Sequence, residues 1–168
     1  RSEPAMIEPF EILRALLLLG VANGAPIVAR RMLGKRFGAP LDAGLVLRDG
    51  RPLLGASKTV RGLVAALALT SAVAPLLDLR WSTGLALAAA SMAGDLLSSF
   101  AKRRIGLRLH AQAFGLDQTP EALLPLWLLR EPLGLGWADV AFAVLLFVAL
   151  EILLSRLLFR LRIREQPY

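Results

Sequence analysis

One carboxylate lies inside an apolar stretch that is long enough to cross a membrane. Asp95 belongs to the run SMAGDLLSSFAKRR. If Ala101 ends the buried part, Asp95 lies about 9 Å deep at about 1.5 Å per residue. A carboxylate at that depth is costly unless it is paired or bound to a cation. Asp95 is therefore predicted to bind a cation in a functional site, and the alternative is a salt bridge to a neighbouring helix.

Three consecutive cations, Lys102, Arg103 and Arg104, follow Asp95 at the end of the same stretch. Carboxylates suit Mg²⁺, and lysine and arginine side chains suit phosphate oxygens. Together they predict a site for a metal-bound polyphosphate at the membrane edge. The alternative is that these cations only set the membrane orientation or contact lipid headgroups.

A second acidic position, Asp117, stands with Gln118 at the start of a short apolar segment. Thr119 suits a helix N-cap and Pro120 suits the first helical position. The positive end of such a helix attracts phosphates. Asp117 and Gln118 are thus candidates for the same site, and plain helix capping is the alternative.

Polar residues also gather around the first long loop. The loop contains Asp42, Asp49 and Lys58, and Arg61 follows Lys58 by one helical turn. Lys58 and Arg61 are candidates for phosphate binding, or else cations that extend to the membrane surface. The run Asn23-Gly24-Ala25-Pro26 is expected to break the first apolar span, as occurs where backbone lines a cavity.

The composition indicates which kind of protein must position these groups. Of 168 residues, 56% are hydrophobic, the net charge is +7 and the mean hydropathy is +0.59. An apolar content above the usual 45–50% excludes disorder. The absence of cysteine excludes a disulfide scaffold, a thiolate metal site and a cysteine nucleophile. A membrane protein with basic loops explains both the apolar content and the charge, so no nucleic-acid partner is expected.

Five apolar stretches are expected to be membrane helices, the fourth of them short: Phe10–Ala29, Val60–Leu79, Ser82–Ala101, Pro120–Leu129 and Ala138–Phe159. The fold class predicted is an all-α integral membrane protein with about five transmembrane helices and a long cytoplasmic loop after the first. Residues 1–168 are expected to form a single domain. A soluble helical bundle is the alternative.

Lysine and arginine alternate between rich and poor loops. They are frequent in residues 30–61, 102–108 and 156–164, whereas Arg80 and Arg130 are the cations of the two other loops. The positive-inside rule then predicts a multi-pass protein of the inner (cytoplasmic) membrane. Its N-terminus would lie outside and its active site on the cytoplasmic face.

Several motifs, in order, resemble the CDP-archaeol synthase family, in what is expected to be a bacterial-type variant. They are ANGAP (Ala22–Pro26), PLDAG (Pro40–Gly44), DGRPLLGASKTVRG (Asp49–Gly62), GDLLSSFAKRRIGL (Gly94–Leu107) and GLDQ (Gly115–Gln118). The family is similar to the phosphatidate cytidylyltransferases, only shorter. The resemblance implies a single membrane-embedded domain with five transmembrane helices.

The resemblance also implies an activity, a cofactor and a set of site residues. A membrane lipid phosphate and CTP would give a CDP-activated lipid and pyrophosphate, with Mg²⁺ as cofactor. Asp95 and Asp117 would hold the metal, and Lys102 would join them as a catalytic residue. The positions implied for substrate binding are Asn23, Asp42, Asp49, Lys58, Arg61, Arg103, Arg104 and Gln118.

One departure from the family pattern concerns the second acidic residue that usually follows GLDQ. Here the sequence continues Thr119-Pro120-Glu121, so the acid stands one position late. Either Glu121 replaces it or the metal has fewer ligands.

Two other functions remain open from sequence. One is a cytidylyltransferase acting on diacyl phosphatidate, because apolar helices accept many lipid chains. The other is a non-catalytic transporter or scaffold that uses Asp95 to bind an ion, although the chain lacks the paired halves common in transporters. The expected partners are CTP, a lipid phosphate and the bilayer.

Overall fold

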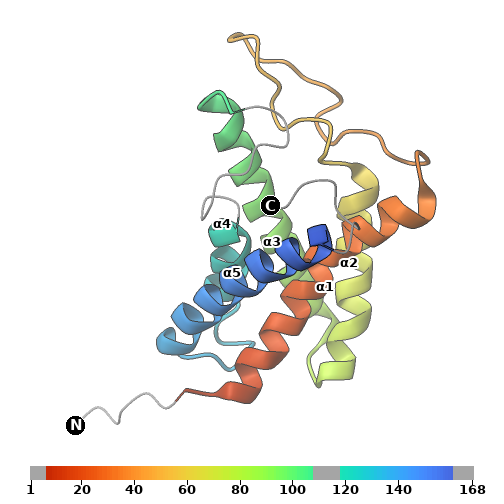
Figure 1. Cartoon of the computed structure of the whole chain (residues 1–168). Helices are drawn as coiled ribbons and strands as arrows, with labels where there is room; N and C mark the ends of the chain where they lie inside the picture. The colour runs from red at the N-terminus through yellow and green to blue at the C-terminus, as the bar shows by residue number, and fades with distance from the viewer. Residues whose placement is uncertain (1–6, 108–117, 161–168) are drawn as a thin grey trace.

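The computed structural model describes residues 7–107 and 118–160, the last six of these by their backbone alone. Its elements are α1 (Pro9–Leu33), α2 (Val60–Val73), the short 3-10 helix η1 (Ala74–Leu77), α3 (Trp81–Arg104), α4 (Gln118–Leu128) and α5 (Trp137–Arg160). No strand occurs among the described residues, where extended pairing is confined to two isolated bridges. The predicted all-α class is confirmed (Figure 1).

Within the described part of the chain, four helical segments are long and apolar enough to cross a membrane: Pro9–Leu33, Val60–Leu77, Trp81–Arg104 and Trp137–Leu154. A helix suits this environment because it satisfies its own backbone N–H and C=O groups where no water is available. The expected short fourth helix is α4, with 11 residues. All five predicted spans therefore correspond to helices, and the protein is a multi-pass membrane protein.

The expected break of the first span is wrong, because α1 continues through Pro26 to Leu33. Pro26 lies at the contact with α2, where a Cβ atom added to Gly62 would be 3.2 Å from Pro26 Cβ. The proline ring therefore packs against a glycine of the neighbouring helix while α1 continues past it.

Helix α3 is central to the bundle: it packs against α1, α2 and α4, and α5 packs against α4 and α1. The fully buried side chains include Leu18 and Leu19 of α1, Leu87 of α3 and Leu126 of α4. Small residues allow close approach of helices, as in other membrane bundles. A Cβ atom on Gly84 of α3 would lie 2.6 Å from the Thr70 carbonyl oxygen of α2.

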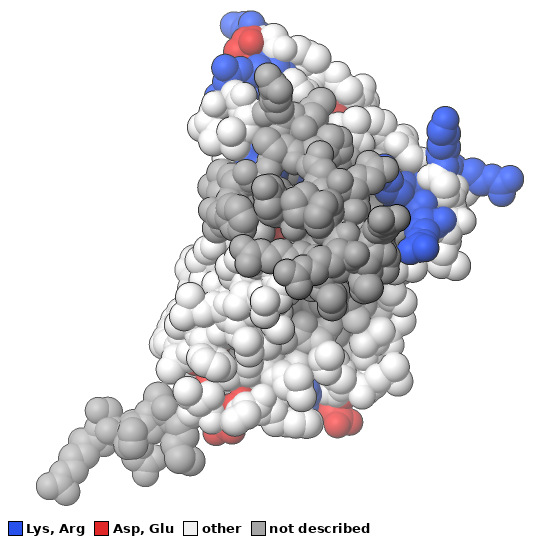
Figure 2. Space-filling model, viewed as in Figure 1, with Lys and Arg blue, Asp and Glu red and all other residues white. Residues whose placement is uncertain are grey.

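Charged side chains separate toward the two ends of the molecule. In Figure 2, most of the blue lysine and arginine side chains gather over the upper end and the upper right, with a few red carboxylates among them, and red carboxylates predominate at the lower end. The upper end contains the loop between α1 and α2 and the C-terminal end of α3 (Figure 1). The helices therefore bring two of the basic segments to one side of the bundle.

Candidate active site

An ion pair joins the first loop to the middle of a membrane helix. Lys58 Nζ lies 2.6 Å from Asp95 Oδ1 and 2.5 Å from Oδ2, and both side chains are partly buried. Lys58 belongs to the loop that precedes α2, and Asp95 belongs to α3. The salt bridge considered from sequence therefore exists, but its partner comes from a loop. A buried carboxylate needs such compensation because desolvation of an unpaired charge is costly.

The first turn of α4 lies directly against α3 beside Asp95. A Cβ atom on Gly94 would lie 2.2 Å from the Pro120 carbonyl oxygen and 2.8 Å from the Glu121 backbone nitrogen. Only a glycine permits this approach. This role of Gly94 was not predicted from sequence, where the available signal was a small residue next to an acid within a span.

Two polar side chains of α4 are buried near this contact. Gln118 is 6% exposed and Glu121 is 9% exposed. Because the Glu121 backbone packs on Gly94, both residues belong to the part of α4 nearest Asp95. Asp117, which precedes Gln118, lies outside the described residues.

Helix α1 contributes Asn23 to the same region. Ser91 Oγ donates a hydrogen bond to Asn23 Oδ1 over 3.3 Å, and Ser91 lies one turn before Asp95 on α3. The Asn23 Nδ2 atom is buried and has no hydrogen-bond partner among the described residues. Asn23 therefore offers an unused donor beside Ser91, on the same part of α3 as Asp95.

Two of the predicted substrate residues bind their own chain instead. The Asp42 carboxylate accepts hydrogen bonds from the backbone nitrogens of Gly44, Leu54 and Gly55, at 3.0, 2.9 and 3.1 Å. Desolvation by burial raises the pKa of Asp42, but these backbone N–H groups outweigh it and leave the pKa below its ordinary value. Asp42 thus folds the loop back on itself, and its assignment to substrate binding stays a prediction.

Arg61 performs a similar structural role at the base of the loop. Its Nη1 atom donates to the carbonyl oxygens of Gly34 and Arg36, at 2.7 and 2.8 Å. These contacts tie the end of α1 to the start of α2. Substrate binding by Arg61 also stays a prediction.

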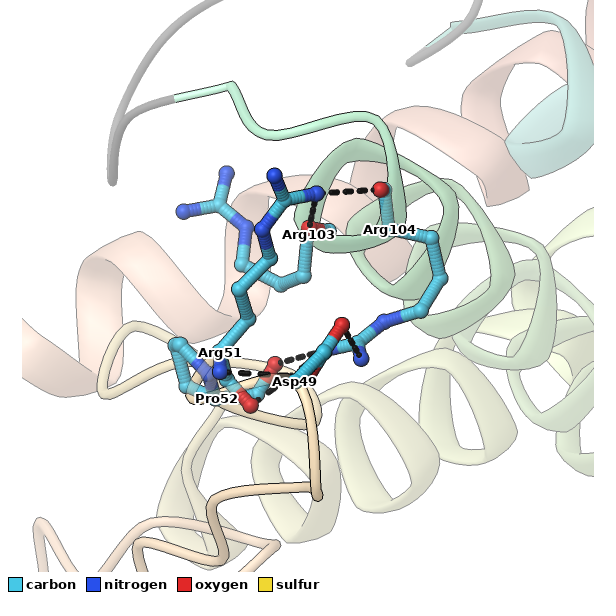
Figure 3. A network of polar contacts seen from close by, with 5 residues as sticks. All are labelled: Asp49, Arg51, Pro52, Arg103 and Arg104. Atoms are coloured by element: carbon cyan, nitrogen blue, oxygen red, sulfur yellow. Dashed lines mark hydrogen bonds and ion pairs between the residues drawn. The ribbon is translucent and has the colours of Figure 1, made fainter.

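The three cations at the end of α3 differ in exposure. Arg103 is buried, at 5% exposure, whereas Lys102 and Arg104 are half-buried. Arg104 Nη1 lies 2.6 Å from Asp49 Oδ2, so two residues that were predicted to bind substrate contact each other (Figure 3). Desolvation raises the pKa of Asp49, but the Arg51 backbone N–H and the Arg104 guanidinium lower it by more. The pKa of Asp49 therefore lies below its ordinary value.

The described residues contain no group of three or more histidine, cysteine or acidic side chains that would hold a metal by themselves. Magnesium commonly uses only one or two carboxylates and takes its other ligands from phosphates and water. Asp95, with the buried Glu121 on the facing helix, fits such a sparse donor set. The structure thus brings Lys58, Asn23 and the first turn of α4, which carries Gln118 and Glu121, to the segment of α3 from Ser91 to Asp95. It keeps Asp42, Asp49, Arg61 and Arg104 in contacts within the chain.

Comparisons with known proteins find similar sequences over most of the chain. A family model described as CarS-like, CDP-archaeol synthase, matches residues 11–168. The CDP-archaeol synthase of Hyperthermus butylicus is 33% identical over 176 residues, covering 97% of this chain and 98% of that protein. The corresponding protein of Sulfolobus acidocaldarius is 34% identical over 155 residues, covering 88% and 91%. These relatives are archaeal, so the expected bacterial-type variant is wrong.

A solved structure is also similar. It was described as an intramembrane enzyme for archaeal membrane lipids biosynthesis, and it matches with a TM-score of 0.73 at 32% identity. The match covers 85% of this chain and 91% of that one. The similarity therefore extends over most of the chain.

Proposed function

The chain belongs to the CDP-archaeol synthase family, and from that premise we propose that it transfers the cytidylyl group of CTP to an archaeal lipid phosphate. The observation that carries the proposal is the surroundings of Asp95. This carboxylate lies within a membrane helix, 2.5 Å from Lys58, with the first turn of α4 packed on the adjacent Gly94. A site at that place reaches both a lipid that cannot leave the bilayer and a nucleotide that cannot enter it.

In the proposed reaction, a phosphate oxygen of the lipid attacks the α-phosphorus of CTP. A new O–P bond forms, the bond from the α-phosphorus to its bridging oxygen breaks, and pyrophosphate leaves with that electron pair. A phosphate monoester is already largely ionised near pH 7, so the lipid needs no general base. A reaction without a general base suits this site, because the described residues near Asp95 include cations, amides and carboxylates. It also suits a chain that has a single histidine.

Mg²⁺ is the cofactor we propose, with Asp95 and Asp117 as its protein ligands. When bound, the ion neutralises phosphate charge and orients the nucleotide. Asp95 would hold this ion in place of its present contact with Lys58. Lys58 would be released toward the phosphates, where its charge is needed.

Lys102 and Arg103 are proposed to bind substrate phosphates. Lys102 lies two helical turns beyond Asp95 on α3, and Arg103 follows it. Positive groups fixed before the reaction stabilise the charge that develops on the leaving pyrophosphate. Lys102 is therefore assigned a catalytic role, and Gln118 and Asn23 are assigned to hydrogen bonding with the substrates.

The orientation in the membrane follows from the distribution of charge. We propose that the basic end in Figure 2 faces the cytoplasm, where CTP is made, and that the N-terminus lies outside. The protein would then belong to the cytoplasmic membrane, with its site at the inner surface.

The experiment that tests the proposal uses the purified chain in detergent with labelled CTP, Mg²⁺ and a panel of ether- and ester-linked lipid phosphates. We expect a labelled CDP-lipid and an equal amount of pyrophosphate, with the ether-linked isoprenoid lipid preferred. Preference for diacyl phosphatidate would overturn the lipid assignment. Absence of any CDP-lipid, with no stabilisation of the protein by CTP and Mg²⁺, would favour the non-catalytic alternative.

A further inference from the structure

Two arginines connect the first loop to the end of α3: one belongs to the loop and binds the helix, and the other belongs to the helix and binds the loop. Arg51 of the loop donates from Nη1 to the carbonyl oxygens of Arg103 and Arg104, at 3.4 and 2.5 Å (Figure 3). The last carbonyls of a helix have no partner within the helix, so Arg51 caps α3 from outside.

The reverse contacts come from the helix. Arg104 donates from Nη2 to the Pro52 carbonyl oxygen at 2.7 Å, and its Nη1 lies 2.6 Å from Asp49 Oδ2. The Asp49 carboxylate also accepts the Arg51 backbone N–H at 3.2 Å. We call this set, Asp49, Arg51, Pro52 and Arg104, the arginine clasp.

The clasp depends on a glycine just after α3. Gly106 has a φ of +82°, and a Cβ atom there would lie 3.0 Å from Arg51 Nη2. The Arg51 guanidinium therefore lies against a backbone position that has no side chain. Alanine at this position would be strained and would also push against the guanidinium.

The loop reaches α3 at a second point, the ion pair of Lys58 with Asp95. Arg104 and Asp95 are nine residues apart on α3, which is about 14 Å at about 1.5 Å per residue. The segment from Arg51 to Lys58 crosses this distance, and Asp42 holds its middle by binding the backbone nitrogens of Leu54 and Gly55. The position of Lys58 thus depends on contacts that begin at the clasp.

We propose that the arginine clasp positions Lys58 on Asp95, and that Arg51 and Arg104 are positioning residues of the site. This inference rests on the proposed function for its catalytic consequence. It also assigns Asp49 and Arg104 a role different from substrate binding, since their charges are already matched to each other and to helix and loop carbonyls.

The chain offers a direct test because it contains three lysines, Lys35, Lys58 and Lys102. An amine-acylating reagent applied to the full chain in detergent, followed by mass spectrometry, gives a labelling rate for each. Lys35 is exposed and serves as the internal reference, whereas the Lys58 amine is held by Asp95. Asp95→Asn, which removes the charge that holds Lys58, is the positive control for release.

Arg51→Ala is expected to raise the Lys58 rate, relative to Lys35, about as far as Asp95→Asn does. Under the proposed function, kcat/KM for CTP should fall about tenfold, since small displacements of positioned groups have effects of this size or larger. Gly106→Ala should shift both measurements in the same direction while keeping both arginines. Arg48→Ala is the matched control, because Arg48 is an exposed arginine of the same loop, and it should leave both unchanged.

The proposal is overturned if Arg51→Ala and Gly106→Ala both leave the relative Lys58 rate within about twofold of the unaltered chain. If Arg51→Ala does not fold, as judged by circular dichroism and Tm, Gly106→Ala and Arg104→Ala decide the outcome. A released Lys58 in a protein that never makes a CDP-lipid would uphold the positioning by the clasp and overturn the proposed function. The two failures are therefore distinguishable.

Discussion

Lys58 and Asp95, 37 positions apart in the sequence, form an ion pair in which one ammonium group lies within 2.6 Å of both carboxylate oxygens. The pair joins a loop at the basic end of the molecule to the membrane-embedded part of α3. In the proposed reaction both residues act on the same nucleotide, one through the metal and the other on phosphate. The contact therefore keeps the two groups close together before substrate binds.

Asp95→Asn is expected to abolish CTP-dependent turnover while the protein stays folded. Asparagine keeps the shape of the side chain but lacks the charge that holds Lys58 and would hold Mg²⁺. Activity is measured as CDP-lipid formation, and folding as Tm in detergent. Near-normal turnover in this variant would show that Asp95 is not a metal ligand.

Gly94→Ala is expected to move α4 away from α3. The added Cβ would lie 2.2 Å from the Pro120 carbonyl oxygen. Because this oxygen belongs to the backbone of α4, the clash can be relieved only if the helix itself moves. Overpacking of this kind destabilises by about 1–3 kcal/mol, and turnover should fall because α4 carries Gln118 and Glu121.

The matched control for this change is Gly20→Ala on α1, where no atom lies within 4 Å of the added Cβ. It should be neutral or stabilise the helix by up to about 1 kcal/mol. Equal Tm values for the two variants would contradict the close approach of α4 at Gly94.

Removal of divalent ions with EDTA is expected to stop turnover, and added Mg²⁺ should restore it. Asp117→Asn should raise the Mg²⁺ concentration needed for half-maximal turnover at least about tenfold. Binding of Mn²⁺, followed by electron paramagnetic resonance, gives a measurement independent of activity.

Glu121→Gln decides between the two interpretations of the departure from the family pattern. Weakened Mn²⁺ binding in this variant means that Glu121 replaces the missing acid. Unchanged Mn²⁺ binding means that the metal has fewer ligands.

Asp42 is expected to make the first loop sensitive to acid. Its pKa is lowered from 3.8 in the folded protein, so its contribution to stability is complete above that value and is lost as the pH falls through the folded pKa. Hydrogen exchange of the Leu54 and Gly55 amides, corrected for intrinsic rates, should therefore accelerate below about pH 4.

In Asp42→Ala those two amides should already be unprotected near neutral pH, because all three hydrogen bonds to the carboxylate are gone. Asp78→Ala, which removes a carboxylate from the αL residue after η1, is the control and should leave them protected. Protection that is unchanged in Asp42→Ala would show that other contacts hold the loop.

The fold class and the spans could be predicted from sequence because they depend on local composition. A helix long enough to cross a bilayer needs only a sufficient run of apolar residues, and Asp95 stands out because it interrupts such a run. The side on which cations gather follows from their alternation between loops. The motifs around Asp95 and Gln118 indicated the family because each motif is a contiguous stretch of the chain and can be read from sequence alone.

The partners of the charged residues depended on packing between distant segments, and only the tertiary structure decided them. An arginine that binds a phosphate and one that binds backbone carbonyls have the same sequence signature, so the contacts of Arg61 and Arg104 could not be predicted beforehand. From sequence, Pro26 predicts a break in the first helix. The structure shows instead that the helix continues and that Pro26 packs against Gly62 of α2. The sequence by itself determined which groups lie at the membrane edge, and the structure decided which of them meet, because each contact requires helices and a loop to approach within a few ångströms.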